Sequence, residues 1–256
     1  MTRLSLVVTT FNNASTLDAC LKSAAPIVDE ILVADSFSQD QTLSIAKAYQ
    51  ARIVQQAFAG YGPQKQWACD QASCEWILLL DADESLSYDL QDELLGLKQA
   101  GLTGPGYRIA RREWMAWQEP IEQHGRWQRA GVKLTDHLRL FDRRLIALST
   151  HPVHAAPYSE QPLPRLQSEL LHTGDAPFAQ RLKKARHYAQ LNAQHQTAGP
   201  RWVLYAKRWL SPLWAFIQDY GLRRYFLDGR LGLAAAWCSA RASVYKYQAL
   251  LHQSKN

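Results

Sequence analysis

The sequence predicts an α/β protein, with a Rossmann-like parallel sheet in its first half and a mostly helical, basic extension at its C-terminus. Short apolar runs alternate with helical stretches through roughly the first 85 residues, which is typical of parallel strands joined by crossover helices. One run, residues 76–81 (WILLLD), is almost entirely apolar, as expected for a strand buried on both faces of a sheet. Basic residues dominate after residue 177.

Four strands are expected, over residues 4–10, 30–35, 52–56 and 76–81. Helices are expected between them, over residues 15–25, 41–50 and 64–72, with Ser15 capping the first and Pro26 ending it. Because a helix joins each pair of successive strands, we expect all four strands to be parallel. Ligands of such sheets bind at the carboxyl ends of the strands, so polar residues there are the first candidates for a functional site.

The composition excludes several classes of protein. The four cysteines show neither C-x-x-C nor zinc spacing, which argues against a disulfide scaffold and a structural zinc site. The opening MTRLSLVVTTFNN lacks the features of a signal peptide, and no run of about 18 uncharged apolar residues predicts a transmembrane helix. The phosphate-binding motifs G-x-G-x-x-G and G-x-x-x-x-G-K-[ST] are also absent. We therefore expect a reduced, cytoplasmic protein without either phosphate-binding loop.

Charge divides the chain near residue 177. Residues 1–177 carry 16 Lys and Arg against 21 Asp and Glu, whereas residues 178–256 carry 13 Lys and Arg against two Asp. We predict a first domain over 1–177 and a helical extension over 178–256. Trp, Tyr and Phe interleave with the cations of the extension and suit an anionic membrane surface. The same composition also fits the core of a helical subdomain, or single-stranded nucleic-acid binding.

Polar residues follow three of the predicted strands. They are Thr9-Thr10 after the first, Asp35-Ser36 after the second, and Asp81-Ala82-Asp83-Glu84 after the fourth. Two carboxylates in the pattern Asp-x-Asp suit Mg²⁺ or Mn²⁺, which prefer oxygen ligands and keep bonds to substrate phosphates. Asp35 is placed to accept hydrogen bonds from a nucleoside. The alternative is an acidic helix N-terminus, with Asp83 or Ser85 as its cap.

Several sequence blocks occur in a characteristic order. They are LSLVVTTFNN (4–13), EILVADSFSQDQT (30–42), GYGPQKQWA (60–68) and WILLLDADE (76–84), then HGRW (124–127), RLFDR (139–143), PLWAFIQDY (212–220) and FLDGRLGL (226–233). The first four resemble family-2 glycosyltransferases, which are inverting enzymes of the GT-A fold that use nucleotide-activated sugars. The other four resemble the lipopolysaccharide-core subgroup. The resemblance covers nearly the whole chain and implies a GT-A nucleotide-sugar-binding domain.

The resemblance also implies roles for individual residues. The nucleoside pocket would be lined by Thr9, Phe11, Asn12 and Asp35. Lys65, beside Gln64, would approach the nucleotide phosphates, and Arg139 would reach a diphosphate or an acceptor phosphate. Asp81 would face the ribose or the sugar, and Asp83 would hold Mg²⁺ or Mn²⁺. The alternatives are a solvated helix position for Lys65 and a strand-edge cation for Arg139.

The implied reaction needs a general base, because an acceptor hydroxyl is a poor nucleophile until its proton is removed. Asp136 is the first candidate, and an ordinary turn aspartate is the alternative. The subgroup often carries V-H-E where this chain has Ala155 after His154, so the role of that glutamate is open to Asp136, His137, His151 or His154. His154 is the second candidate because imidazole titrates near neutral pH; a buried structural histidine is its alternative.

These observations predict a metal-dependent, inverting hexosyltransferase that uses a nucleotide-sugar, with UDP-glucose as the first donor to test. The acceptor would be a lipopolysaccharide-core or related lipid-linked saccharide. The enzyme would be cytoplasmic and peripheral on the anionic cytoplasmic face of the inner membrane. Nucleic acid is not expected as a partner. A nucleic-acid-binding protein and a nucleotidyltransferase on a similar sheet are the competing hypotheses.

Overall fold

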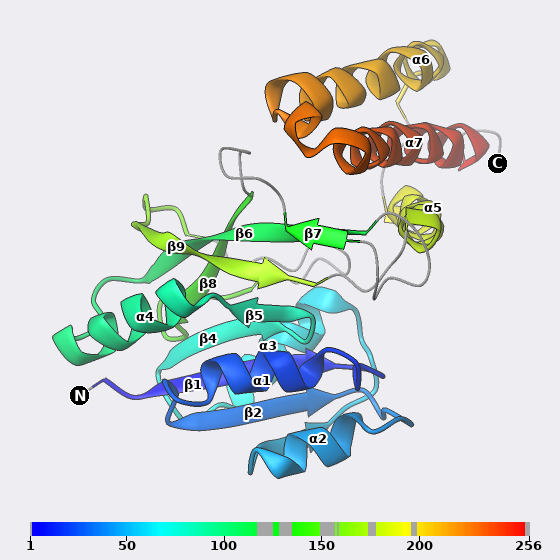
Figure 1. The fold of residues 1–256 in the computed structure, drawn as a ribbon. Coiled ribbons are helices and arrows are strands. Elements are labelled where there is room, and N and C mark those ends of the chain that lie inside the picture. The colour runs from blue at the N-terminus through cyan, green and yellow to red at the C-terminus, as the bar shows by residue number, and fades with distance from the viewer. Residues whose placement is uncertain are drawn as a thin grey trace. The chain divides into compact units, whose positions relative to one another are not determined.

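The structure is a computed structural model that describes residues 2–116, 125–127, 135–148, 157, 159–173, 178–195 and 199–253. The chain divides into two compact units (Figure 1). Unit 1 comprises residues 1–113 and 134–174, and unit 2 comprises residues 114–133 and 175–256. The domain boundary after residue 177 stays a prediction, and the compact units differ from it by assigning residues 114–133 and 175–177 to unit 2.

The first four strands of unit 1 form the parallel part of its sheet. β1 (Leu4–Thr10) lies between β2 (Glu30–Asp35) and β4 (Trp76–Asp81), and β3 (Arg52–Gln55) pairs with the outer side of β2. All of these pairings are parallel, as the sequence predicts. The Rossmann-like α/β fold is therefore confirmed.

The sheet continues beyond β4 with strands of mixed direction, in the order β4-β8-β6-β9-β5. β8 (Thr135–Asp142) pairs antiparallel with both β4 and β6 (Gly106–Ala116). β9 (Arg165–His172) pairs parallel with β6 and antiparallel with the short β5 (Glu84–Leu86). This arrangement brings β5, β6, β8 and β9 next to the carboxyl end of β4, where the sequence places its Asp-x-Asp pattern (Figure 1).

Helices supply two hydrophobic cores, one on each face of the sheet. α1 (Leu17–Ala24), α2 (Thr42–Ala48) and α4 (Tyr88–Ala100) contribute to the core that contains Leu78 and Leu80, and α3 (Tyr61–Gln71) contributes to the core that contains Ile77 and Leu79. Successive residues of β4 thus alternate between the two cores, which explains why its sequence is continuously apolar. Burying a Leu or Ile side chain stabilises a fold by roughly 1.5–3 kcal/mol.

Two local expectations are wrong. α1 begins at Leu17, and its N-cap residue is Thr16 and not Ser15. Residues after β4 do not begin a helix either: Glu84–Leu86 is a strand, and α4 is capped by Ser87, whose Oγ accepts from the Leu90 N–H at 3.2 Å. The alternative in which Asp83 or Ser85 caps a helix is therefore excluded.

Unit 2 is mainly helical, so the predicted helical C-terminal region is confirmed. It contains the short strand β7 (Gly125–Trp127), then α5 (Phe178–His195), α6 (Arg201–Ile217), the π-helix η2 (Gln218–Leu222), the 3-10 helix η3 (Tyr225–Asp228) and α7 (Gly229–Gln253). α7 packs against both α5 and α6. The buried side chains of Ala193, Leu204, Leu250 and Leu251 form the core between these helices. Among the described residues, no helix is both long enough and apolar enough to cross a bilayer.

Glu30, at the start of β2, ties together the amino-terminal ends of three strands of unit 1. Its carboxylate accepts hydrogen bonds from Ser5 Oγ, from the Ser73 N–H at 2.7 Å and from Arg52 Nη2 at 2.8 Å. Burial alone would raise the pKa of Glu30, but these hydrogen bonds outweigh it and lower the pKa from 4.5 to about 2. The ionised carboxylate therefore stabilises the folded state.

We expect Glu30→Gln to lower the free energy of unfolding near pH 7 by about 2 kcal/mol, because the folded state loses its preference for the ionised group. A lowered pKa stabilises above the ordinary pKa of 4.5, and that stabilisation is lost as the pH falls towards 2. Urea unfolding at a series of pH values should show the two proteins converging over this range. Glu75→Gln is the control, because the Glu75–Arg144 pair is mostly exposed. If the difference in free energy of unfolding between wild type and Glu30→Gln does not become smaller as the pH is lowered, the prediction is contradicted.

Candidate functional site

The carboxyl ends of β1, β2 and β4 meet at one edge of the sheet. The strand register pairs Thr10 with Asp35 and Thr9 with Asp81. The buried Asp35 carboxylate accepts four hydrogen bonds: from Thr10 Oγ1 (3.1 Å), the Ser38 N–H (2.9 Å), Ser38 Oγ (2.5 Å) and Gln55 Nε2 (3.1 Å). Asp35 therefore holds the loop after β2 against its neighbours, and a direct contact with a nucleoside stays a prediction.

The loop after β1 is joined to the loop after β2 through Asn12. Its N–H donates to Ser38 Oγ at 2.8 Å, and its side-chain oxygen accepts from the Gln39 N–H at 2.8 Å. Asn12 has a φ of 53°, a left-handed conformation that Asn tolerates better than most residues. The neighbouring Phe11 ring is exposed. The nucleoside contacts predicted for Thr9, Phe11 and Asn12 stay predictions, but the three residues do lie at this edge.

Asp81, the last residue of β4, lies between two buried cations. Lys65 Nζ contacts its Oδ1, and Arg139 Nη2 contacts its Oδ2 at 2.7 Å. Burial would raise the pKa of Asp81, but Lys65 and Arg139 outweigh burial and hold that pKa far below its ordinary value. Lys65 is therefore not a solvated helix residue, and Arg139 is not an exposed strand-edge cation.

Arg139 reaches Asp81 from a β-bulge in β8. Tyr107 pairs with Leu140 and Arg108 with Leu138, so Arg139 is an extra residue with no partner in β6. The same Nη2 also donates to Glu84 Oε1 at 2.5 Å. Glu84 is fully buried, and its Oε2 accepts from the Asp81 N–H at 3.0 Å. One guanidinium thus joins the end of β4 to the start of β5.

A second set of ion pairs lies next to the first. Arg111 of β6 contacts Glu84 Oε1 at 3.1 Å and Glu113 Oε1 at 2.9 Å. His172, at the end of β9, lies between two carboxylates, with its Nδ1 2.6 Å from Glu113 Oε2 and its Nε2 3.2 Å from Asp83 Oδ2. Burial would lower the pKa of His172, but Asp83 and Glu113 outweigh it and raise the pKa to about 9. A positive charge therefore sits between Asp83 and Glu113 at neutral pH.

The two neighbours Asp136 and His137 face opposite sides of the sheet. His137 pairs with Ile109, on the side of Arg111, and the pKa of His137 is lowered to about 4 by burial and by the charges of Arg139 and Arg111. Its imidazole is therefore neutral at pH 7, with Nε2 3.0 Å from Thr135 Oγ1.

Asp136 instead pairs with the two half-exposed cations of the other face. Arg165 Nε lies 3.0 Å and Arg108 Nη2 lies 3.5 Å from its carboxylate. The structure therefore does not bring Asp136 together with Asp81 and Asp83. The role of Asp136 as the general base stays a prediction, and its position on the other face of the sheet argues against it. His154, the second candidate, lies outside the described residues, as does His151.

Among these groups, the Asp83 carboxylate is the one that could hold a divalent cation. His172, with Nε2 3.2 Å from Asp83 Oδ2, is protonated at neutral pH, so its imidazole has no lone pair to bind a metal. Mg²⁺ commonly takes only one or two protein carboxylates and completes its shell with phosphate oxygens and water. Within the described ranges, no group of three or more His, Cys, Asp and Glu side chains is arranged as a metal site.

Sequence reasoning missed four charged residues of this cluster: Glu84, Arg111, Glu113 and His172. Glu84 belongs to the quoted DADE run, where it is interpreted only as a helix-end charge. Arg111, Glu113 and His172 lie on strands that the sequence does not predict individually. The one signal in the sequence is the two-residue spacing of Arg111 and Glu113, which places both on the same face of a strand; nothing comparable points to His172.

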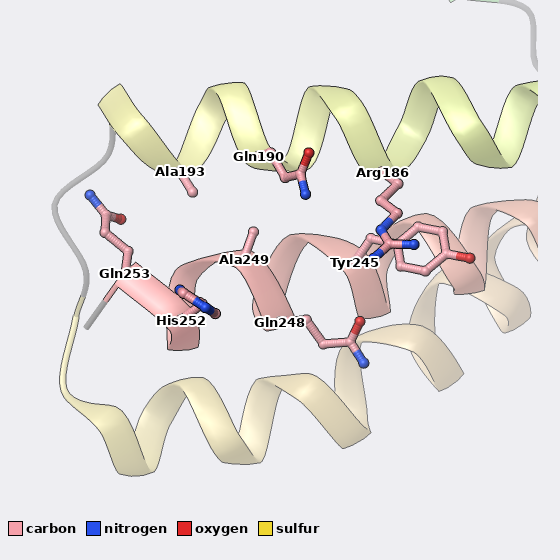
Figure 2. Close-up of a pocket in the computed structure, with 8 residues that line it drawn as sticks. All are labelled: Arg186, Gln190, Ala193, Tyr245, Gln248, Ala249, His252 and Gln253. Atoms are coloured by element: carbon pink, nitrogen blue, oxygen red, sulfur yellow. The ribbon is translucent and has the colours of Figure 1, made fainter. Parts of the chain in front are cut away.

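A separate groove lies in unit 2, between α5 and α7 (Figure 2). Figure 2 shows Arg186, Gln190 and Ala193 of α5 facing residues of α7 that include Tyr245 and Ala249. None of the residues that line the groove carries a carboxylate. It therefore lacks the acidic ligands expected of a site for a metal-bound diphosphate.

The chain is similar to known proteins of one family. A family model described as Glycosyl transferase family 2 matches residues 5–153. An uncharacterized glycosyltransferase of Rickettsia felis is 39% identical over 37% of this chain and 33% of its own length. The chain thus spans about a third of that relative. The lipopolysaccharide core biosynthesis glycosyltransferase LpsC of Rhizobium meliloti is 28% identical over 95% of this chain and 89% of LpsC.

Two solved structures illustrate the structural similarity. TarS 1-349 of S. aureus matches with a TM-score of 0.49 and 16% identity, over 93% of this chain and 90% of TarS. Glucosyl-3-phosphoglycerate synthase of Mycobacterium tuberculosis, in complex with Mg²⁺ and uridine-diphosphate, matches with a TM-score of 0.36 and 24% identity, over 44% of each chain. Both scores are below 0.5, so the family assignment rests on the family model.

We expect Arg139→Met to lower the free energy of unfolding by about 3 kcal/mol, because breaking a buried ion pair leaves its carboxylates undercompensated. Urea unfolding at pH 7 measures the loss. Arg165→Met is the control, because Arg165 also pairs with an aspartate but is half exposed, and it should cost less than about 1 kcal/mol. Equal losses in the two variants would show that burial of Arg139 does not set its contribution.

Proposed function

Because the chain belongs to glycosyl transferase family 2, we propose that it moves a sugar from a nucleotide-sugar to a lipid-linked saccharide, by single displacement with inversion at the anomeric carbon. UDP-glucose is the donor that we propose first. A lipopolysaccharide-core acceptor is proposed because the similarity to LpsC covers 95% of the chain. The enzyme would act while peripheral on the cytoplasmic face of the inner membrane.

The main observation in support of the proposal is the cluster of charged side chains at the end of β4, in which positive and negative charges are equal in number. Four carboxylates are matched by four cations: Asp81, Asp83, Glu84 and Glu113 by Lys65, Arg111, Arg139 and protonated His172. A bound diphosphate would add negative charge to a cluster that is already neutral. A divalent cation supplied with the nucleotide would offset that charge, which agrees with a metal-dependent enzyme.

Each residue of the cluster has a role in this proposal. Lys65 and Arg139 keep Asp81 ionised and fix its orientation, so that it can accept hydrogen bonds from the hydroxyls of the ribose or the sugar. Asp83 would hold Mg²⁺ or Mn²⁺, with the protonated His172 beside it as a fixed positive charge. When bound, the cation would neutralise the charge that develops on the departing diphosphate.

We assign the general base to His137, not to Asp136. The neutral imidazole can accept a proton, and it faces the side of the sheet that carries Arg111. Asp136 faces the other side and is paired with Arg108 and Arg165. The proton of the acceptor hydroxyl would pass to the imidazole as the oxygen attacks the anomeric carbon.

We expect UDP and Mn²⁺ together to raise the melting temperature of the wild-type protein, because a ligand that binds only the folded state stabilises it. Asp83→Asn should lose the part of this shift that requires Mn²⁺, and its rate of sugar transfer should fall at least about a hundredfold. Asp89→Asn, an exposed aspartate on α4, is the matched control and should behave as wild type. Full Mn²⁺-dependent transfer by Asp83→Asn would reject the metal role.

We expect His137→Gln to lower kcat at least about a hundredfold, since general base catalysis typically contributes that much. Its UDP-induced thermal shift should not change, because the base contacts the acceptor and not the nucleotide. Asp136→Asn should keep kcat within a few-fold of wild type. An inactive Asp136→Asn together with an active His137→Gln would restore Asp136 as the base.

A further inference from the structure

α6 carries an exposed apolar stripe, although it belongs to the helical core of unit 2. Trp202, Trp209, Leu213 and Ile217 are 75%, 77%, 59% and 44% exposed. At the pitch of an α-helix these four positions lie within about 80° of one another around the axis, so they form one face. The opposite side of α6 packs inward through the buried Leu204. Contiguous exposed apolar surface of this kind marks an interaction site.

The stripe continues into an apolar groove between α6 and α7. Leu213 and Phe216 of α6 and Leu233, Trp237 and Val244 of α7 line this groove, which has a volume of about 880 Å³. Leu233 and Trp237 are themselves largely exposed. The groove is also lined by two cations, Arg230 and Arg241. An elongated apolar ligand with an anionic group therefore matches its lining.

The exposed charge on this part of unit 2 is of one sign. In the described residues from 178 to 253 the only carboxylates are Asp219 and Asp228, and both are buried. Asp219 is neutralised by Arg223, whose Nη1 lies 2.6 Å away. Arg201, Lys207, Arg230 and Arg241 are exposed. The surface beside the stripe thus offers cations and no exposed carboxylate, which is complementary to an anionic partner.

These observations favour binding to a lipid surface over the two alternatives, a helical core and nucleic-acid binding. The tryptophans of α6 are exposed, so they are not the core of a helical subdomain. Leu213 and Ile217 share the stripe with Trp202 and Trp209, and aliphatic side chains do not stack on bases as aromatic side chains do. A helix with an aliphatic and Trp face flanked by cations is typical of a helix lying in the membrane interface.

We infer that the stripe of α6 and the groove between α6 and α7 bind the protein to an anionic phospholipid bilayer, with one phospholipid acyl chain in the groove and its phosphate beside one of the two arginines that line it, Arg230 or Arg241. Trp202 and Trp209 enter the headgroup layer, and Leu213 and Ile217 enter the edge of the acyl region. This inference rests on the proposed function for its purpose, since it brings the enzyme to a lipid-linked acceptor.

The test is co-sedimentation of the full chain with vesicles of about three parts phosphatidylcholine to one part phosphatidylglycerol, and with phosphatidylcholine alone. Trp209→Ser with Leu213→Ser should weaken partitioning at least about tenfold, because two apolar anchors are lost. The matched control is Tyr88→Ser with Leu145→Ser, two exposed apolar residues of unit 1, which should partition as wild type. Arg230→Gln with Arg241→Gln should weaken binding to the anionic vesicles and leave the weaker binding to phosphatidylcholine unchanged.

Each alternative occupant gives a different result. Wild-type partitioning by the Trp209/Leu213 variant, or an equal loss in the unit 1 control, would overturn the inference. Self-association through α6 without vesicle binding, or salt-sensitive binding of an oligonucleotide without vesicle binding, would overturn it as well. The thermal shift with UDP and Mn²⁺ separates this proposal from the proposed function. A Trp209/Leu213 variant that keeps the thermal shift has lost only membrane binding. Wild-type protein that binds vesicles but transfers no sugar refutes only the proposed reaction.

Discussion

The geometry of the site depends on one buried guanidinium, that of Arg139, held between Asp81 and Glu84. The three groups come from β8, β4 and β5, so their ion pairs fix how the antiparallel part of the sheet joins the parallel part. Burying such charges is costly, and among the described residues Arg139 Nε has no hydrogen-bond partner. Apolar residues in place of all three charged groups would pack there at less cost. The buried charges are therefore better explained by the site than by stability.

Arg139 helps to set the protonation states of two different groups. Lys65 and Arg139 hold Asp81 ionised against burial, while Arg139 and Arg111 add to the effect of burial on His137 and keep its imidazole neutral. His172, which faces Asp83 and Glu113 instead of cations, is held protonated. Two histidines in one unit thus differ in charge at pH 7 because their nearest charged neighbours differ in sign. This division gives a proton acceptor on one side of the cluster and a fixed positive charge on the other.

Local sequence was sufficient for the parallel strands and insufficient for the strands that complete the site. Residues 4–10, 30–35 and 76–81 are apolar runs whose burial decides their structure, and their bounds agree with the strands observed. Glu113 and His172 meet only because β6 and β9 pair across a long stretch of chain, which no local pattern encodes. The bulge at Arg139 matters most, because one extra residue reverses which side chains of β8 face each side. It turns His137, and not Asp136, towards Arg111.

For unit 2 the composition alone leaves three interpretations open, and the burial of individual side chains distinguishes between them. Judged by composition alone, aromatic residues among cations fit a hydrophobic core, a nucleic-acid-binding surface and a membrane-binding surface equally well. Burial distinguishes them, since Leu204, Leu250 and Leu251 form the core while Trp202 and Trp209 remain outside it. Burial of both aspartates removes the only negative charges in these helices from the surface. The net charge of the segment therefore understates how uniformly positive its exposed surface is, and uniform sign beside an apolar stripe is what an anionic bilayer requires.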